Sequence, residues 1–166
     1  MAEAVQSIPS LEALDALTAT HKYVILDFTA QWCPPCKAIA PLYQKLATEH
    51  AAPGALAFGK VDVDEAQPVA AKFGISAMPT FLFLVDGEPA GIDVGAPLAG
   101  KQTVLRTEGS GPDGPLVAIR GADPASLVGA VKKVAELAAA VKAEPAKAEE
   151  AKAEEPKAEE AKVESA

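Results

Sequence analysis

The chain has 166 residues and a formal net charge of −8, enough for one domain with a sizeable core and an appendage. The acidic balance argues against nucleic-acid binding, which depends on neutralising phosphates with Lys and Arg. No apolar run approaches the ~20 residues of a membrane span, and the first twenty residues lack a basic start and an apolar block, so we expect no membrane or targeting segment and a cytoplasmic or nuclear protein.

Residues 1–141 are predicted to form one α/β domain, because short apolar runs alternate with helical patterns. The predicted elements, in chain order, are a helix over 11–19 capped by Ser10, a strand at 23–29, a helix over 37–50 with Ile39, Leu42 and Leu46 buried, a strand at 56–63, a helix that Asp64 caps and Gly74 ends, strands at 80–85 and 116–120, and a last helix opened by Asp123-Pro124. This order predicts a mixed central sheet with helices on both faces.

Two segments do not fit this pattern. Residues 89–115 are rich in Gly and Pro, with short apolar stretches at 92–94 and 104–105, and are predicted to be an insertion in the hairpin between the last two strands. In an alternative alignment the last strand lies at 92–95; we prefer 116–120, because Gly121 then leads directly into the final helix. Residues 142–166 repeat Lys, Ala and Glu and cannot bury a core, so we expect a disordered or partly helical tail.

The chain has two cysteines, both in the segment Trp32-Cys33-Pro34-Pro35-Cys36-Lys37. A disulfide between them closes almost no loop and stabilises little, so the pair either reacts or binds metal. A zinc site needs two further ligands, and only His21 and His50 remain; we therefore expect no metal. The segment follows a predicted strand and opens a helix, whose free N–H groups and dipole favour a Cys33 thiolate. Cys36, one turn further, can attack a mixed disulfide at Cys33.

The residues beside the cysteines can adjust this chemistry. Pro34 and Pro35 restrict the turn and remove N–H donors, which should shift the balance between dithiol and disulfide. Trp32 can supply an apolar wall next to the sulfur.

A carboxylate, Asp27, interrupts the apolar strand at 23–29. Burial would raise its pKa toward neutrality, where it could exchange a proton with Cys36 as a general base. The alternative is an Asp on the exposed face of a half-buried strand. Lys60, at the corresponding place in the next strand, would either modulate Asp27 or simply be solvated.

The third candidate position is Met78-Pro79-Thr80. A proline directly before a central strand indicates a tight turn, for which a cis bond is one option. A cis Pro79 would turn the Met78 backbone outward as an edge for an extended peptide. The alternative is a proline that merely starts a strand.

In their order along the chain these motifs resemble the thioredoxin family: Asp27-Phe28, the Cys33–Cys36 segment, Ala40-Pro41, residues 60–64, Met78-Pro79-Thr80 and Gly121. The resemblance implies a thioredoxin fold and a monomeric protein-disulfide reductase active in cell redox homeostasis. It implies Cys33 as nucleophile, Cys36 as resolving thiol and Asp27 as proton acceptor. Trp32, Pro34, Pro35, Met78, Pro79 and Gly121 would contact substrate.

The resemblance also implies how electrons reach the site. No cofactor would be bound; the redox-active disulfide Cys33–Cys36 would receive electrons from NADPH through thioredoxin reductase and pass them to targets such as peroxiredoxins. The Met-Pro-Thr motif looks more like the eukaryotic cytosolic branch. Pro34 departs from the family, which usually has Gly there, so a disulfide isomerase or oxidase and a redox-dependent binding adaptor stay as alternatives.

Overall fold

Strands between residues 5 and 120 form one mixed sheet in the computed structural model, which describes residues 4–89, 91–92, 104–106 and 115–142. The described helices and strands, in chain order, are β1 (Val5–Ser7), α1 (Leu11–Thr20), β2 (Tyr23–Thr29), α2 (Pro34–His50), β3 (Leu56–Asp62), α3 (Gln67–Lys72), β4 (Thr80–Val85), β5 (Glu88–Pro89), β6 (Val104–Arg106), β7 (Leu116–Arg120) and α4 (Pro124–Lys142). The strand order is β1-β3-β2-β4-β7-β6, and β5 pairs with β4. Strands β1, β3 and β2 are parallel, whereas the remaining pairings are antiparallel.

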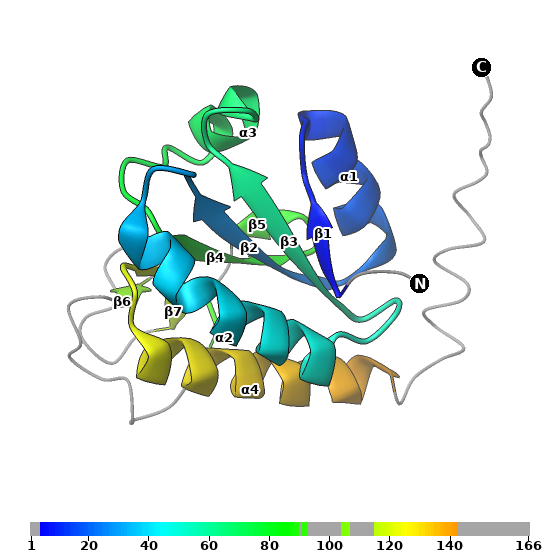
Figure 1. The fold of residues 1–166 in the computed structure, drawn as a ribbon. Coiled ribbons are helices and arrows are strands. Elements are labelled where there is room, and N and C mark those ends of the chain that lie inside the picture. The colour runs from blue at the N-terminus through cyan, green and yellow to red at the C-terminus, as the bar shows by residue number, and fades with distance from the viewer. Residues whose placement is uncertain (1–3, 90, 93–103, 107–114, 143–166) are drawn as a thin grey trace, which may run out of the picture.

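Helices cover both faces of this sheet, as predicted. Helices α2 and α4 lie side by side on one face, and α1 and α3 lie on the other (Figure 1). Alternation along β4 divides the core: Phe81 and Phe83 pack toward α2 and α4, while Leu82 and Leu84 belong to the opposite cluster. Strand β2 is buried along its whole length, which makes it the central strand expected from its apolar composition.

Two predicted helix starts are confirmed by their caps. The Ser10 hydroxyl accepts a hydrogen bond from Ala13 N at 3.1 Å, and the Asp123 carboxylate accepts one from Ser126 N at 3.2 Å. Each side chain satisfies a backbone donor that the first helical turn leaves free.

The predicted cap of the third helix is wrong. Helix α3 begins at Gln67 behind Ala66, which offers no side-chain cap. Instead the Asp62 carboxylate accepts hydrogen bonds from the backbone N of Asp64 at 2.9 Å and of Glu65 at 3.3 Å. Asp62 thus shapes a turn between β3 and α3, and the Asp64 side chain is directed elsewhere.

Other boundaries also differ from the prediction. Helix α2 begins at Pro34 rather than at residue 37, because two prolines at its first positions have no N–H to lose. Strand β1 was not expected, and pairs with β3 from Val5↔Phe58 to Ser7↔Lys60. The short strand β6 lies within the segment predicted to be an insertion, and β5 ends at the first residue of that segment.

The last strand lies where the preferred alignment placed it. Strand β7 pairs with β4 from Thr80↔Arg120 to Leu82↔Ala118, and β6 pairs with the other edge of β7. Residue 92 of the alternative alignment forms a single bridge to Leu116, and 93–95 lie outside the described residues. The predicted tail from residue 143 onward also lies outside them.

Candidate active site

The two cysteines lie at the N-terminus of α2, just after the chain leaves the central strand β2. Cys33 is the N-cap residue, and its Sγ accepts a hydrogen bond from Cys36 N at 3.2 Å. A disulfide joins Cys33 to Cys36. Both residues are buried, and Pro34 and Pro35 are exposed in the first helical turn between them. In the reduced protein, the Cys36 N–H and the helix dipole at this end favour a thiolate on Cys33.

Cys33 faces the loop before β4. Its Sγ lies 3.8 Å from the Met78 carbonyl oxygen, and the Met78–Pro79 peptide bond is cis. The Pro79 carbonyl accepts a hydrogen bond from Gly121 N at 2.7 Å. Gly121 has a φ of 106°, a backbone conformation that residues with a side chain rarely adopt. The structure therefore brings Met78 beside Cys33 and Gly121 against Pro79, although these segments are far apart in the sequence.

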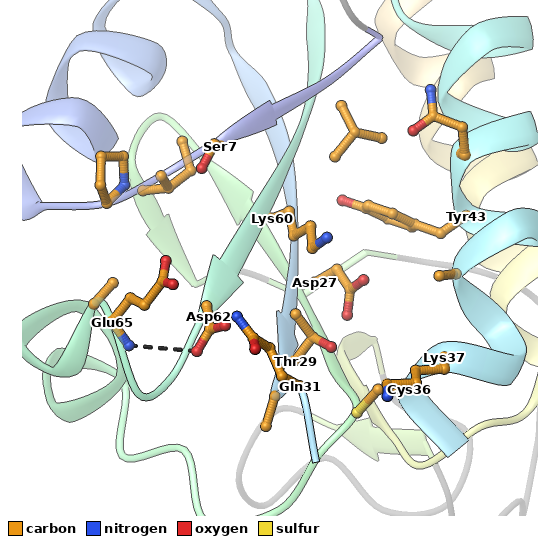
Figure 2. Close-up of a pocket in the computed structure, with 17 residues that line it drawn as sticks. Ser7, Asp27, Thr29, Gln31, Cys36, Lys37, Tyr43, Lys60, Asp62 and Glu65 are labelled. Atoms are coloured by element: carbon orange, nitrogen blue, oxygen red, sulfur yellow. Dashed lines mark hydrogen bonds between the residues drawn. The ribbon is translucent and has the colours of Figure 1, made fainter. Parts of the chain in front are cut away.

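Cys36 lines a cavity of about 610 Å³ between α2 and the strands β1, β2 and β3. Figure 2 shows Asp27, Lys60 and Tyr43 around this cavity, with the Asp27 carboxyl directed toward α2. The two sulfurs thus have different surroundings: Cys33 lies beside the half-buried Met78, and Cys36 lines the cavity that holds the buried acid Asp27.

Asp27 is 3% exposed, so the interpretation of a buried carboxyl is confirmed and the exposed alternative is wrong. Burial raises its pKa from 3.8 to about 7, against a smaller opposing effect of the Lys60 ammonium. Its Oδ1 has no hydrogen-bond partner among the described residues. A buried carboxyl with this pKa can both release and accept a proton near neutral pH.

Lys60 pairs with Asp27 in the register of β2 and β3. Lys60 is exposed to solvent, yet it also lines the cavity. Both interpretations of Lys60 therefore hold in part: it is solvated, and its charge reaches the carboxyl.

Trp32 is 64% exposed and is held in place by a residue of the turn between β3 and α3. Its indole Nε1 donates a hydrogen bond to the Asp64 carboxylate at 2.8 Å. The sequence assigned Asp64 to a helix cap and missed this contact, which joins residues 32 positions apart.

Tyr43 was also missed. It was not counted in the buried stripe of the second helix, yet it is 2% exposed and lines the cavity beside Asp27, whereas Leu42 is half-buried. The available signal was its spacing of seven residues from Cys36, which places both on one helix face.

Two other kinds of feature are absent from the described residues. They contain no group of three or more His, Cys, Asp or Glu side chains placed to hold a metal ion. None of their helices is long and apolar enough to cross a membrane.

Comparison with known proteins was made on sequence and on structure. The family model described as Thioredoxin matches residues 5–105. A thioredoxin-like protein of Fusarium culmorum is 40% identical over 134 residues, covering 81% of this chain and 93% of that protein. A thioredoxin of Neurospora crassa is 39% identical over 138 residues, covering 83% and 92%. Among solved structures, the thioredoxin of Malassezia sympodialis superposes with a TM-score of 0.56 at 30% identity, covering 79% of this chain and 90% of that one.

Proposed function

The chain belongs to the thioredoxin family, its Cys33–Cys36 pair makes it a thiol–disulfide oxidoreductase, and we propose that it works as a reductase of protein disulfides. The observation that carries the proposal is the different surroundings of the two sulfurs. Cys33 Sγ lies 3.8 Å from the Met78 carbonyl oxygen in the loop before β4, while Cys36 lines the cavity that holds Asp27. Attack and resolution need these two environments.

In the first step the Cys33 thiolate attacks one sulfur of a disulfide in the bound target. A bond forms between Cys33 Sγ and that sulfur, the target disulfide breaks, and the other target sulfur leaves as a thiolate. We propose that an extended target segment lies along Met78, Pro79 and Gly121, with Trp32, Pro34 and Pro35 bordering it. Backbone groups of such a loop can form hydrogen bonds with an extended peptide whatever its amino-acid sequence.

In the second step Cys36 resolves the mixed disulfide. Asp27 takes the proton from the Cys36 thiol, and the resulting thiolate attacks Cys33 Sγ, so that the Cys33–Cys36 disulfide forms and the second target sulfur leaves. The target gains two electrons and the site loses two. Lys60 modulates the step by lowering the pKa of Asp27, which burial alone would raise further.

The oxidised site must then be reduced again. We propose that a thioredoxin reductase supplies two electrons from NADPH, that the targets include peroxiredoxins, and that the protein acts as a monomer in the cytoplasm or nucleus, where thiols are kept reduced. We also propose that 1–141 is the thioredoxin domain and that residues 89–115 and 142–166 are an insertion and a tail.

The test is NADPH-coupled reduction of insulin disulfides with purified thioredoxin reductase. Cys33→Ser should abolish turnover, whereas Cys36→Ser should accumulate a covalent complex with insulin that a thiol reductant releases. Full turnover by Cys33→Ser would overturn the assignment. The reduction potential separates a reductase from an isomerase: thioredoxins as a class lie near about −270 mV and protein disulfide isomerase near about −180 mV.

A further inference from the structure

A buried hydroxyl ties the active-site helix to the two strands beneath it. Tyr43 Oη lies 2.9 Å from the Ile25 carbonyl oxygen on β2 and 2.7 Å from the Gly59 carbonyl oxygen on β3, and it donates to both. A phenol has one proton, so the two carbonyls share it. The hydroxyl therefore links two adjacent strands through a single shared proton.

Aromatic packing fixes where this hydroxyl can lie. The Tyr43 ring meets the Phe58 ring edge to face at a centroid distance of 5.7 Å and the Phe81 ring at 5.4 Å. Such contacts orient a ring as well as bury it. The hydroxyl is thus held against the strands by its ring on one side and by its hydrogen bonds on the other.

The two carbonyls belong to the part of the sheet that carries the buried acid. Ile25 stands two residues before Asp27 on the same face of β2, and Gly59 stands directly before Lys60, which pairs with Asp27. Tyr43 and Cys36 are seven residues apart on α2, which is about two turns, so they share one face of the helix. Both line the same cavity.

We propose that Tyr43 is a positioning residue for the resolving step: its hydroxyl holds α2 at a set depth on β2 and β3 and thereby fixes how closely Cys36 approaches the Asp27 carboxyl. The proposal rests on the role proposed above for Asp27. Proton transfer depends steeply on the separation of its partners, and displacements of about 1 Å can slow such steps greatly. A phenylalanine at this position would keep the ring packing and lose only the tie.

The hydroxyl itself stays protonated over the working pH range. Burial raises the pKa of Tyr43 well above its ordinary value, and the charge of Asp27 raises it further. The charged groups that face Asp27 across the cavity are Lys37 from α2, Lys60 and Asp62 from β3, and Glu65 from the turn after it. None of them is removed by changing Tyr43.

The test uses the reduced full-length protein and an aromatic disulfide, dithiobis(nitrobenzoate), as probe. Attack by Cys33 releases one thionitrobenzoate and resolution by Cys36 releases a second, so one trace separates the two steps. Tyr43→Phe should slow the second release about fivefold, as expected for the loss of one neutral hydrogen bond, and leave the first release within about twofold. Tyr23→Phe, which changes the other tyrosine of the chain, should alter neither.

A second background separates positioning from a general loss of structure. In Asp27→Asn the proton acceptor is absent, so adding Tyr43→Phe should produce no further slowing of the second release. Equal slowing in both backgrounds, or an unchanged second release in Tyr43→Phe, would overturn the proposal. If Asp27→Asn alone leaves the second release unchanged, Asp27 is not the proton acceptor. That result would overturn the role proposed for Asp27 and, with it, the positioning role of Tyr43.

Discussion

Replacing Asp27 with Asn should stabilise the oxidised protein, and increasingly so as the pH rises. The pKa of Asp27 is raised from 3.8 to about 7 in the folded state. Between these values the folded protein holds a proton that the unfolded chain has released, so stability falls as the pH rises through this window and is constant above it. At about 1.4 kcal/mol per pKa unit, the buried carboxylate costs about 4 kcal/mol at alkaline pH.

Asn has nearly the same shape and carries no charge, so Asp27→Asn removes this cost. The gain in unfolding free energy should be larger at about pH 8 than at about pH 5 by about 2–3 kcal/mol, the part of the titration that falls between them. Urea unfolding of both proteins at a series of pH values measures it. Asp15→Asn, at an exposed position of α1, is the matched control and should show no such trend. A gain from Asp27→Asn that stays constant from pH 5 to about pH 8 would refute the reasoning.

Three further substitutions test neighbouring parts of the structure. Lys60→Gln removes the charge that lowers the pKa of Asp27, so the carboxyl should titrate above about 7 in carbon-detected NMR; an unchanged or lower midpoint contradicts the coupling. Gly59→Ala would place a Cβ 2.9 Å from Leu26 Cδ2, and this overpacking should lower the free energy of unfolding in urea by about 1–3 kcal/mol. An unaltered urea midpoint would mean that the neighbouring side chains move aside, and it would contradict the prediction. Ser10→Ala removes the cap of α1 and should lower the free energy of unfolding by about 1 kcal/mol, whereas Ser10→Asp should restore most of it. Equal stability of the two variants would show that the side chain at this position does not stabilise the helix.

Features encoded by neighbouring residues could be predicted from the sequence. The caps at Ser10 and Asp123 act within one helical turn, and the strand at 23–29 is apolar enough to require burial on both faces. The burial of Asp27 inside that strand was the preferred prediction, and the structure decided it against an exposed position. The order of Cys33, Cys36 and Pro79 along an α/β pattern was sufficient for the fold class, and the roles of the two sulfurs stay a prediction.

Features that depend on distant partners could not be predicted. Strand β1 has the sequence Val-Gln-Ser, which has no apolar run and becomes a strand only through pairing with β3. Strand β6 likewise exists through its pairing with β7. Trp32 and Asp64 are 32 positions apart, and the carbonyls that bind Tyr43 are 18 and 16 positions away. In each case the deciding contact is made only after the chain has folded.

The most direct test of the proposed chemistry is the rate at which each reduced cysteine is alkylated by iodoacetamide across a pH series, resolved by mass spectrometry. The helix N-terminus should give Cys33 a pKa below about 8.5, the value of a free thiol, and make it the faster site at neutral pH. Cys36, facing the cavity with Asp27, should react slowly throughout. Equal rates that rise together near about pH 8.5 would contradict the division of roles between the two sulfurs.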